Sequence, residues 1–497
     1  MMRIVILGGG TAGWMAANLF AHRWPDKAQV TVIESPEIGI VGVGEGSTPQ
    51  LKALFDTLGI AEAEWMPACH ATYKNGIGFR GWSETPGFAQ YFHPFAGPLD
   101  RHTEDAFFFN TGARRHRHDV VAHPDRFYLP ARLAAQRLAP VAPENFPLGA
   151  SYGYHFDAHL VGAFLRDVAV KRGVTHLERR IVEVAVDNGQ VTHLVAEGGE
   201  QITGDLFVDA SGFRSVIHQG ALGVPFHSFG ENLFNDSAVV MPTPADPTGT
   251  NSATLATALR HGWAWDIPLT SRTGNGYVYS SRYCSAEDAE AELRAHLGVG
   301  DDVAARHLQM RVGRVADSWA GNSLAIGLAQ GFIEPLEATA LHIVQATVEG
   351  FIHAYEASGF TPDHRADFNQ RIAARYDGIR DYIVCHYRMN RRTDTDYWRD
   401  NAANDRLSDS LKAILTCWFT GGDLAAEIAE QDIARYYAPM SWHCLLAGYG
   451  QFPDQAKLSP ADPRAARHDM AAIDRFLDRA ALNFVPHSAA LSALRDR

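Results

Sequence analysis

Ile4-Val5-Ile6-Leu7-Gly8-Gly9-Gly10-Thr11-Ala12-Gly13 is the stretch that decides the fold of this chain. An apolar run rich in β-branched residues precedes the glycines, and the pattern from Trp14 to Phe20 predicts a helix. A second β-rich run, Val30 to Ile33, ends in Glu34, which lies 21 residues after the last of these glycines. Strand, glycine turn, helix, strand and acid in this order predict a βαβ dinucleotide-binding domain.

Each glycine of the turn has a physical task in such a domain. Gly8 permits the tight turn, Gly10 lets the backbone approach a pyrophosphate, and Gly13 lets the helix pack closely on the strand. The start of the helix offers N–H groups and its positive dipole end to phosphates, and the acid accepts hydrogen bonds from ribose hydroxyls. A glycine turn without a ligand is the alternative, which the complete order of elements disfavours. The predicted cofactor contacts here are Gly8, Gly10, Thr11, Ala12, Gly13 and Glu34.

The fingerprint alone does not separate FAD from NAD. FAD is favoured by its position at the start of a 497-residue chain and by Gly-Asp-Leu-Phe-Val-Asp-Ala-Ser-Gly at 204–212. That segment resembles the one that closes the FAD domain of flavin monooxygenases. A second dinucleotide fingerprint is not apparent, which favours FADH2 supplied by a separate reductase, although single-component monooxygenases can bind NADPH without one.

Composition and charge exclude several partners. With 46% apolar and 20% charged residues, the chain has the composition of a soluble globular enzyme. Its formal charge of -13 argues against nucleic-acid or anionic-membrane partners, which need a basic surface. We interpret the one basic run, 114–118, as a solvated loop. The run from Arg3 to the residue before the first glycine is only five residues long, too few for a signal peptide or a membrane span.

Cysteine and histidine spacing predicts neither disulfides nor a metal site. The cysteines are odd in number and scattered, which fits a reduced cytoplasmic compartment. The 23 histidines show no HExxH pairing, so a zinc site is not predicted. The five cysteines are Cys69, Cys284, Cys385, Cys417 and Cys444.

The predicted fold is α/β, with a flavin monooxygenase-like FAD-binding Rossmann domain, an inserted second β-sheet and a mainly helical C-terminal region. We expect loops and short helices over 51–148, a helix from Asp157 to Arg172, and helices from Ala338 onwards. A hairpin is predicted from 181–187 to 191–196 across Asn188-Gly189. Strands of the second sheet are predicted at 237–241, 264–269 and 277–281. The predicted division is 1–337, the FAD module with its inserted sheet, and 338–497, which covers the substrate site.

Further motifs occur in order along most of the chain. They are Gly42 to Pro49, Ala71 to Trp82, Phe92 to Phe95, Tyr154 to Ala158, Trp263 to Pro268, Gly331 to Glu337 and Cys444 to Gly448. With the glycine turn, they make the sequence similar to the flavin-dependent tryptophan/indole halogenases. The resemblance implies that reduced FAD and dioxygen oxidise a halide ion to hypohalous acid, which halogenates an aromatic ring. It also implies FAD contacts at Gly46, Ser47, Leu328 and Leu341.

Lys74 matches the lysine that guides the hypohalous acid in this family. An ammonium can hydrogen-bond and polarise the acid, whereas a neutral amine could accept the halogen covalently. Most lysines lie at the surface, but the aromatic and aliphatic neighbours of Lys74 favour burial. Glu337 matches the second catalytic residue, which stabilises the cationic ring and accepts its proton. Glu334 is its competitor, and the register after Pro-Leu selects Glu337.

Thr339 and Ala340 fall where backbone amides of the family contact halide. The usual Ser-Thr-Gly reads Ala338-Thr339-Ala340 here. Backbone donors survive a change from glycine to alanine unless the glycine needed a positive φ. The departure puts halide affinity in question, and we expect bromide to be handled at least as well as chloride.

Trp263, Trp265, Ile267 and Pro268 match a signature thought to separate substrate from flavin in this family. Tryptophans two residues apart lie on one side of a strand. Core packing alone is the alternative, because most tryptophans serve packing. The lysine and the glutamate favour the signature.

Substrate residues follow from the same resemblance. His93 and Phe95 match aromatics that sandwich an indole, and Tyr437 falls near a third wall. Tryptophan-specific members of the family clamp the amino acid with a tyrosine pair followed by a glutamate and a Phe-Trp pair, and the stretch 425–432 lacks that pattern. We therefore predict activity on indole or larger indole-bearing molecules and poor activity on L-tryptophan. A flavin monooxygenase and a catalytically silent FAD-binding protein are the alternatives, and a monomer or a homodimer is predicted.

Overall fold

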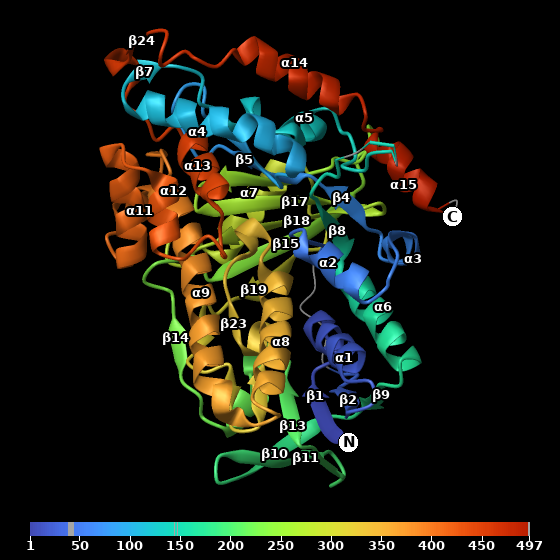
Figure 1. Cartoon of the computed structure of the whole chain (residues 1–497). Coiled ribbons are helices and arrows are strands. Elements are labelled where there is room, and N and C mark those ends of the chain that lie inside the picture. The colour runs from blue at the N-terminus through green and yellow to red at the C-terminus, as the bar shows by residue number, and fades with distance from the viewer. Residues whose placement is uncertain (38–43, 144, 147, 496–497) are drawn as a thin grey trace. The chain divides into compact units, whose positions relative to one another are not determined.

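The computed structural model describes residues 1–37, 44–143, 145–146 and 148–495 (Figure 1). The chain forms two compact units, each assembled from three separate stretches. The first unit contains Met1–Ala71, Phe156–Gly230 and Met310–Asp377, and the second contains Thr72–His155, Glu231–Gln309 and Gly378–Arg497. The division into 1–337 and 338–497 stays a prediction.

The first unit is built on a six-stranded sheet. Its strands lie in the order β21-β22-β13-β1-β2-β9, and β1 pairs in parallel with both β2 and β13. Helices cover strands that are apolar on both faces, and Ile4, Ile6 and Val32 are fully buried. The strands are β1 (Met2–Leu7), β2 (Ala28–Glu34), β9 (Thr175–Glu178), β13 (Leu206–Asp209), β21 (Trp319–Ala320) and β22 (Ser323–Ala325). The predicted nucleotide-binding βαβ unit is confirmed.

The other elements of the first unit surround this sheet. Helix α6 begins at Asp157, whose carboxylate accepts hydrogen bonds from the amides of His159 and Leu160 as an N-cap. The helix predicted over 157–172 and the hairpin β10–β11 are confirmed. The helices are α1 (Thr11–Arg23), α2 (Gln50–Thr57), α3 (Glu62–Ala68), α6 (Ala158–Lys171) and α8 (Ala340–Ala357). The remaining strands are β3 (Gly44–Gly46), β10 (Ile181–Asp187), β11 (Gln190–Ala196), β12 (Gln201–Thr203), β14 (Phe226–Ser228), β20 (Gly313–Val315) and β23 (Gly331–Phe332).

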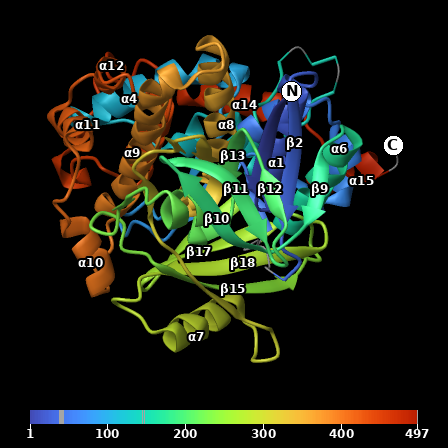
Figure 2. The ribbon, with the colours of Figure 1, turned by 90° about the horizontal axis from the view of Figure 1, so that it is seen from below.

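The second unit contains the predicted second sheet. Its seven strands lie in the order β19-β15-β18-β17-β16-β5-β6, and only β5 and β16 pair in parallel. Figure 2 shows helix α7 (Ala286–Leu297) beside β15 and β18, where its Ala289 and Leu293 join a buried apolar cluster. The strands are β5 (Gly76–Arg80), β6 (Gln90–Pro94), β15 (Ser237–Pro244), β16 (Thr254–Leu259), β17 (Gly262–Pro268), β18 (Arg272–Tyr279) and β19 (Arg306–Gln309).

The region 51–148 is more regular than the sequence suggested. It contains β4 (Thr72–Lys74), β5 and β6, so the expectation of loops and short helices there was wrong. Glycines and prolines obscure the period-two pattern, and these strands form because the sheet buries them. The region also contains β7 (His118–Asp119), α4 (Arg101–Arg115) and α5 (Leu129–Ala135).

The basic run 114–118 is likewise not a solvated loop throughout. Arg115 lies in the last turn of α4 and donates hydrogen bonds to the carbonyls of Cys417, Trp418 and Gly422, at and just after the end of helix α11 (Asp409–Thr420). Arginine at a helix C-terminus satisfies carbonyls that lack helical partners. The residue is therefore a structural cap.

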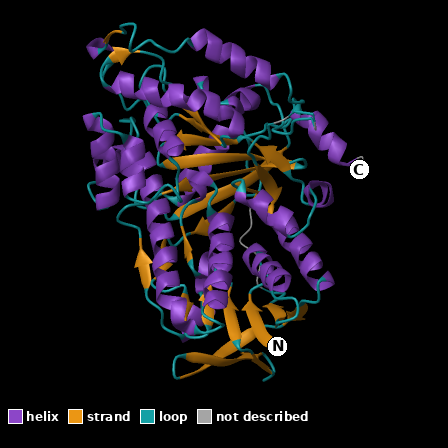
Figure 3. Cartoon of the chain, in the orientation of Figure 1, coloured by secondary structure: helices purple, strands orange, loops and turns teal. Residues whose placement is uncertain are grey.

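The C-terminal region is mainly helical, as predicted (Figure 3). After α8 follow α9 (Arg365–Arg388), α10 (Asp396–Ala403), α11 (Asp409–Thr420), α12 (Leu424–Glu430), α13 (Pro439–Gly448), α14 (Met470–Ala481) and α15 (His487–Arg495), with β24 (Ser459–Pro460) paired to β7. Within the described ranges, no helix is both long and apolar enough to cross a membrane. The same residues contain no cluster of metal-ligating side chains, and the five cysteines stand outside any disulfide.

Candidate active site

The glycine turn after β1 has space in one place only. Gly8 has φ +121°, and a methyl group on it would clash with the carbonyl oxygen of Ala210. A methyl group on Gly13 would clash with the carbonyl oxygen of Gly8. At Gly10 it would meet no protein atom within 4 Å. The turn is therefore closed where strand and helix meet and open where a pyrophosphate needs to approach, so these residues fit a dinucleotide cofactor.

Helix α1 presents backbone donors at this opening. It begins at Thr11 without a side-chain cap and without an acidic residue in its first turn. The Thr11 hydroxyl donates to the carbonyl of Ala158 at 3.1 Å, which holds α1 against α6. The first amides of the helix have no helical acceptor and point outward along the helix axis. Thr11 and Ala12, both predicted cofactor contacts, lie at this helix start.

Glu34 is the last residue of β2, and its side chain lies beside the glycine turn. Its Oε1 is 2.6 Å from Nε2 of His176 on β9. Its Oε2 lies so close to Gly9 that a methyl group there would clash with it. His176 also packs edge-on against Trp14, with ring centroids 5.2 Å apart. The sequence reasoning missed Gly9 and His176, because only the pairing of β9 with β2 brings the histidine beside the acid.

Asp209 organises the return of the chain to the sheet. It is fully buried, and its carboxylate accepts hydrogen bonds from the Ser211 hydroxyl at 2.6 Å and from the amides of Ile217 and His218 at 2.8 and 2.9 Å. These bonds hold the turn at Ala210, whose carbonyl borders the glycine turn. The resemblance of 204–212 to a segment closing an FAD domain is consistent with β13 lying beside β1.

The turn that carries Leu328 packs on the starts of α1 and α8. It is a 3₁₀ turn, Gly327–Ala329, and a methyl group on Gly327 would lie 2.9 Å from Cβ of Ala12 and 3.9 Å from Cγ2 of Val344. Leu341 lies in the first turn of α8. Gly46 ends β3 and Ser47 is buried, whereas Gly42 and Val43 of the same motif fall outside the described residues.

Glu337 ends the 3₁₀ turn Pro335–Glu337 in the first unit and is 3% exposed. Glu334 is also buried, so burial does not choose between the two carboxylates. Ala338 follows with φ +56° and ψ +37°, a left-handed conformation that costs a residue with a side chain about 1 kcal/mol. The chain uses this turn to pass directly into α8.

Thr339 and Ala340 start α8 in ordinary right-handed conformations. Thr339 is the N-cap with φ -89°, and Ala340 is the first helical residue. The change from the family's glycine to Ala340 therefore meets no backbone obstacle, and the strained position is Ala338 instead. The first backbone bond of the turn runs from the Ile343 amide to the Thr339 carbonyl, which leaves earlier amides without helical acceptors.

His342 lies in the first turn of α8 and stays neutral. Burial, with the charge of Arg375, lowers the pKa of His342 to about 4. An Arg375 Nη1 lies 3.4 Å from Nε2 of this imidazole. The arginine and the helix start together make this part of the first unit favourable to an anion.

Lys74 lies in the second unit, at the end of β4. This strand pairs antiparallel with β8 (Gly153–Asp157), and Lys74 stands opposite Gly153. The lysine is fully buried, and its Nζ lies 5.3 Å from the ring centroid of Phe95. A cation over an aromatic face gains electrostatic stabilisation that partly offsets its burial. The lysine is thus the buried residue that its neighbours in the sequence suggested.

Trp263 and Trp265 lie side by side on β17, with ring centroids 6.1 Å apart and exposures of 1% and 7%. The Trp265 ring covers Gly276 of β18, where a methyl group would clash with it. Ile267 and Pro268 complete the strand, and Ile267 is buried. Both tryptophans therefore face one side of the sheet, as their spacing predicts.

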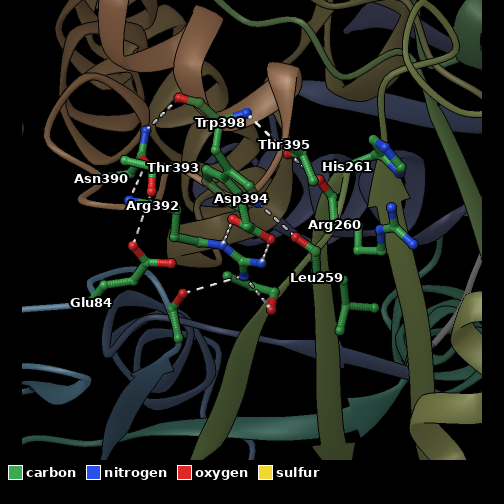
Figure 4. Close-up of polar contacts among 12 residues, drawn as sticks. Glu84, Leu259, Arg260, His261, Asn390, Arg392, Thr393, Asp394, Thr395 and Trp398 are labelled. Atoms are coloured by element: carbon green, nitrogen blue, oxygen red, sulfur yellow. Dashed lines mark hydrogen bonds and ion pairs between the residues drawn. The ribbon is translucent and has the colours of Figure 1, made fainter.

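A loop from the helical region fixes the turn before these tryptophans (Figure 4). Arg392 donates two hydrogen bonds to the Asp394 carboxylate, at 2.9 and 2.6 Å, and one to the carbonyl of Ala258 at 2.9 Å. The indole nitrogen of Trp398 donates to the carbonyl of Leu259 at 2.7 Å. The β16–β17 turn is thus tied to the segment 390–398 by charged and neutral hydrogen bonds.

His93 and Tyr437 meet through a residue that the sequence reasoning missed. Tyr382 of α9 stacks on Tyr437, with centroids 3.6 Å apart, and its hydroxyl donates to the carbonyl of Ser441 at 3.0 Å. His93 Nε2 lies 3.1 Å from the Ser441 hydroxyl. Trp442 packs edge-on against Tyr382. Phe95 belongs to the surroundings of Lys74 instead, with its ring centroid 5.3 Å from the lysine Nζ.

The predicted residues thus fall into two groups. The first unit holds the predicted FAD contacts with Glu337, Thr339 and Ala340. The second holds Lys74, His93, Phe95, Tyr437 and the tryptophan strand. The stretch 425–432, where a tryptophan clamp is missing from the sequence, lies mostly in α12, with Ile428 buried.

The open glycine turn, the acid beyond it and the returning strand β13 are features of an FAD-dependent oxidoreductase. The family model described as tryptophan halogenase matches residues 3–462. The 7-chloro-L-tryptophan 6-halogenase KtzR of Kutzneria sp. (strain 744) is 37% identical over 511 residues, which cover 96% of each chain. The chain belongs to the tryptophan halogenase family and is a flavin-dependent halogenase.

Solved structures of relatives have the same fold. The tryptophan 6-halogenase SttH from Streptomyces toxytricini matches with a TM-score of 0.85 and 33% identity, covering 99% of both chains. BrvH, a flavin-dependent halogenase from Brevundimonas sp. BAL3, matches with a TM-score of 0.84 and 31% identity, also covering 99% of both. Halogenation is therefore favoured over the hydroxylase and the silent FAD-binding protein that the sequence left open.

Proposed function

We propose that this halogenase brominates or chlorinates free indole, a substituted indole or a larger indole-bearing molecule through hypohalous acid that Lys74 guides. The observation that carries the proposal is the buried ammonium of Lys74 over the Phe95 ring. Lys74 ends β4, and only Asn75 separates it from β5, a strand of the sheet that bears Trp263 and Trp265. A buried cation is costly and is retained where chemistry needs it.

The glycine turn and its neighbours would hold the cofactor. The open space at Gly10 accommodates the pyrophosphate, the amides of Thr11 and Ala12 bind its charge, and Glu34 receives the ribose hydroxyls. When bound, FADH2 supplies, with dioxygen, the oxidising power that turns halide into hypohalous acid. A separate flavin reductase delivers the FADH2. The contacts of Gly46, Ser47, Leu328 and Leu341 belong to the same proposal.

Lys74 presents the halogen to one ring carbon. Its ammonium donates a hydrogen bond to the oxygen of hypohalous acid and draws electrons from the oxygen–halogen bond, which makes the halogen electrophilic. The neutral amine could instead take the halogen covalently. Either route needs a buried nitrogen, because water would carry a small, diffusible oxidant away.

Glu337 completes the substitution. The ring carbon forms a bond to the halogen while the halogen–oxygen bond breaks, and the ring becomes positively charged. A buried carboxylate stabilises that charge and accepts the proton from the same carbon, which restores aromaticity, with water as the other product. The 3% exposure of Glu337 supports this role because low dielectric surroundings strengthen the interaction.

The start of α8 is the proposed halide site. Amides at Thr339 and Ala340 lie at a helix N-terminus, where the dipole favours an anion. Ala340 adopts a conformation open to any residue, so the missing glycine leaves the donors in place. We propose that bromide is used at least as well as chloride.

The substrate lies against His93, Phe95 and Tyr437. Several relatives are named for tryptophan, yet α12 of this chain carries alanines and acids where a clamp for the amino acid would need aromatic rings. An indole without charged amino-acid groups needs no clamp. The chain is further proposed to be a cytoplasmic monomer or homodimer with no nucleic-acid or membrane partner.

Mass spectrometry of indole and L-tryptophan, incubated with enzyme, flavin reductase, oxygen and bromide or chloride, tests the proposal. Halogenated indole should exceed halogenated tryptophan, and a strong preference for L-tryptophan contradicts the substrate assignment. Lys74→Ala and Glu337→Gln should each lower product by about a hundredfold or more while FAD binding persists. Lys52→Ala, which alters a partly exposed lysine paired with Asp56, is the matched control.

A further inference from the structure

The strand that carries Lys74 is held by a chain of hydrogen bonds through a buried histidine. In the β4–β8 pair, Thr72 stands opposite His155, and Thr72 and Lys74 lie on the same face because they are two residues apart. His155 is fully buried. Its Nδ1 lies 2.9 Å from the Thr72 hydroxyl, and its Nε2 lies 2.9 Å from the hydroxyl of Thr254 on β16.

The direction of these bonds follows from the number of available protons. The Thr72 hydroxyl lies 2.7 Å from the carbonyl oxygen of Pro268, which can only accept, so its single proton goes there. Toward His155, the Thr72 oxygen must therefore accept, and Nδ1 carries the proton. Nε2 is then an acceptor and takes the proton of the Thr254 hydroxyl. The chain runs from Thr254 through His155 and Thr72 to Pro268.

This series of hydrogen bonds joins four strands, including the strand of Lys74. Thr254 begins β16, His155 lies in β8, Thr72 begins β4, and Pro268 ends the strand of Trp263 and Trp265. The bond in which Nε2 accepts the Thr254 proton requires a neutral imidazole, because a protonated Nε2 has no lone pair and would have to donate to that hydroxyl oxygen instead. Burial, the charge of Lys74 and His487 hold the pKa of His155 well below its usual range. The histidine therefore leaves the lysine as the local cation.

We propose that His155 is a positioning residue for Lys74, which aligns the ammonium with the end of the tryptophan strand through Thr72. The inference rests on the proposed role of Lys74. These hydrogen bonds would fix the position of the Lys74 nitrogen. That position decides whether hypohalous acid reacts with the ring or escapes. A misplacement of about 1 Å costs up to a hundredfold in rate.

The test replaces the hydroxyl and keeps the shape. Thr72→Val removes both bonds of Thr72 in a side chain of nearly the same volume, and Thr72→Ser keeps the hydroxyl as the conservative rescue. Both are assayed with FADH2, oxygen, bromide and indole, and brominated indole is compared with free hypobromous acid trapped by monochlorodimedone. For Thr72→Val we expect about tenfold less brominated indole and a matching rise in trapped acid, whereas Thr72→Ser should restore the ratio.

A second pair protects the test against misfolding. Thr254→Val removes the hydrogen bond at the other end, between Thr254 and His155, and Thr254→Ser keeps it; neither change alters the lysine strand. Thermal unfolding and FAD binding are measured for all four variants. If Thr72→Val does not fold, the Thr254 pair decides, with a shift toward trapped acid of about threefold expected for valine alone.

Three outcomes contradict the proposal, and one of them also removes its basis. A folded Thr72→Val enzyme with the wild-type ratio of product to trapped acid overturns it, as do equal losses in the valine and serine variants, which would show that packing matters and the hydroxyl does not. Lys74→Ala in the same assay separates the two levels: a Lys74→Ala variant that still brominates indole refutes the proposed function itself. Loss in Lys74→Ala beside an unchanged Thr72→Val refutes only the role of His155.

Discussion

The glycine turn of the first unit and the lysine strand of the second are built from different chemical groups. The turn works through backbone: spaces at glycines, helix amides and a carbonyl of Ala210. The lysine region works through side chains from distant segments, including Lys74, Phe95 and His155. A site built from backbone accepts an added side chain only where open space remains. A site built from side chains loses a contact whenever one of the partners is replaced. A substitution at the glycine turn therefore tests whether space is available, whereas a substitution in the lysine region tests whether a side-chain contact is needed.

The largest effect is expected at the glycine turn. Gly13→Ala places a methyl group against the Gly8 carbonyl, which neither neighbour can avoid, and should destabilise the fold by about 3 kcal/mol or more. Gly10→Ala meets no protein atom within 4 Å and should leave stability within about 0.5 kcal/mol of wild type. It should nevertheless weaken FAD binding, because the methyl group enters the space proposed for the cofactor. Denaturant unfolding and a titration of FAD fluorescence measure the two effects separately.

The prediction for Gly10→Ala is contradicted if this variant binds FAD as tightly as wild type. The open side of the turn would then not be the cofactor site. A large loss of stability in Gly10→Ala would contradict the open space itself.

The contrast between local and distant contacts also explains what the sequence could predict. The βαβ unit, the helix after Asp157 and the hairpin at Asn188-Gly189 were predicted because neighbours in the chain determine them. Both residues of that hairpin turn have positive φ, 49° and 72°, as a two-residue hairpin turn requires. The sequence signal and the structural cause lie in the same few residues.

The contacts of the second unit could not be predicted in this way. Tyr382 stacks on Tyr437 from 55 positions away, and Thr72 reaches Pro268 across 196. Strands β4 to β6 were missed because their glycines and prolines hide the alternation, and burial in the sheet stabilises them. The resemblance to a family identified Lys74 without revealing the histidine beside it.

A second test concerns His487, which joins the C-terminal helix to the lysine strand. Its Nε2 accepts the Tyr73 amide proton at 3.1 Å, and its Nδ1 lies 3.1 Å from the Thr250 carbonyl. Burial lowers the pKa of His487 to about 4, although the carbonyl contacts oppose the shift. The folded pKa is thus below the unfolded value of about 6.5, so the stability contributed by the neutral form is complete above pH 6.5 and is lost as the pH falls toward 4. The loss should reach about 3 kcal/mol.

His487→Asn removes this titration and should make the curve of unfolding free energy less steep between pH 6.5 and 4. His22→Asn, at an exposed position of α1, is the control and should keep the wild-type slope. Identical slopes in wild type and His487→Asn would show that the histidine is not held neutral. Its side-chain contacts would then not contribute to stability in the way proposed for this region.

A third test applies the glycine argument to the second unit. Gly276→Ala places a methyl group in the Trp265 ring and should destabilise the sheet by about 2 kcal/mol. Trp265→Leu in the same chain frees the space, so the double variant should be more stable than the sum of the two single changes. Denaturant unfolding of the four proteins completes the cycle. Additive losses would mean that the glycine does not exist to accommodate the tryptophan.

The smallest effect is expected at Ala338, where a strained backbone residue directly follows the buried side chain of Glu337. Its φ of +56° is strained for alanine and natural for glycine, so Ala338→Gly should stabilise the folded protein by up to about 1 kcal/mol. The gain is reduced because glycine also makes the unfolded chain more flexible. If the strain also holds the buried Glu337 in place, Ala338→Gly should raise thermal stability while lowering product formation. A stabilised variant with unchanged turnover would show that the strained backbone is only the route into α8 and that packing alone positions the carboxylate.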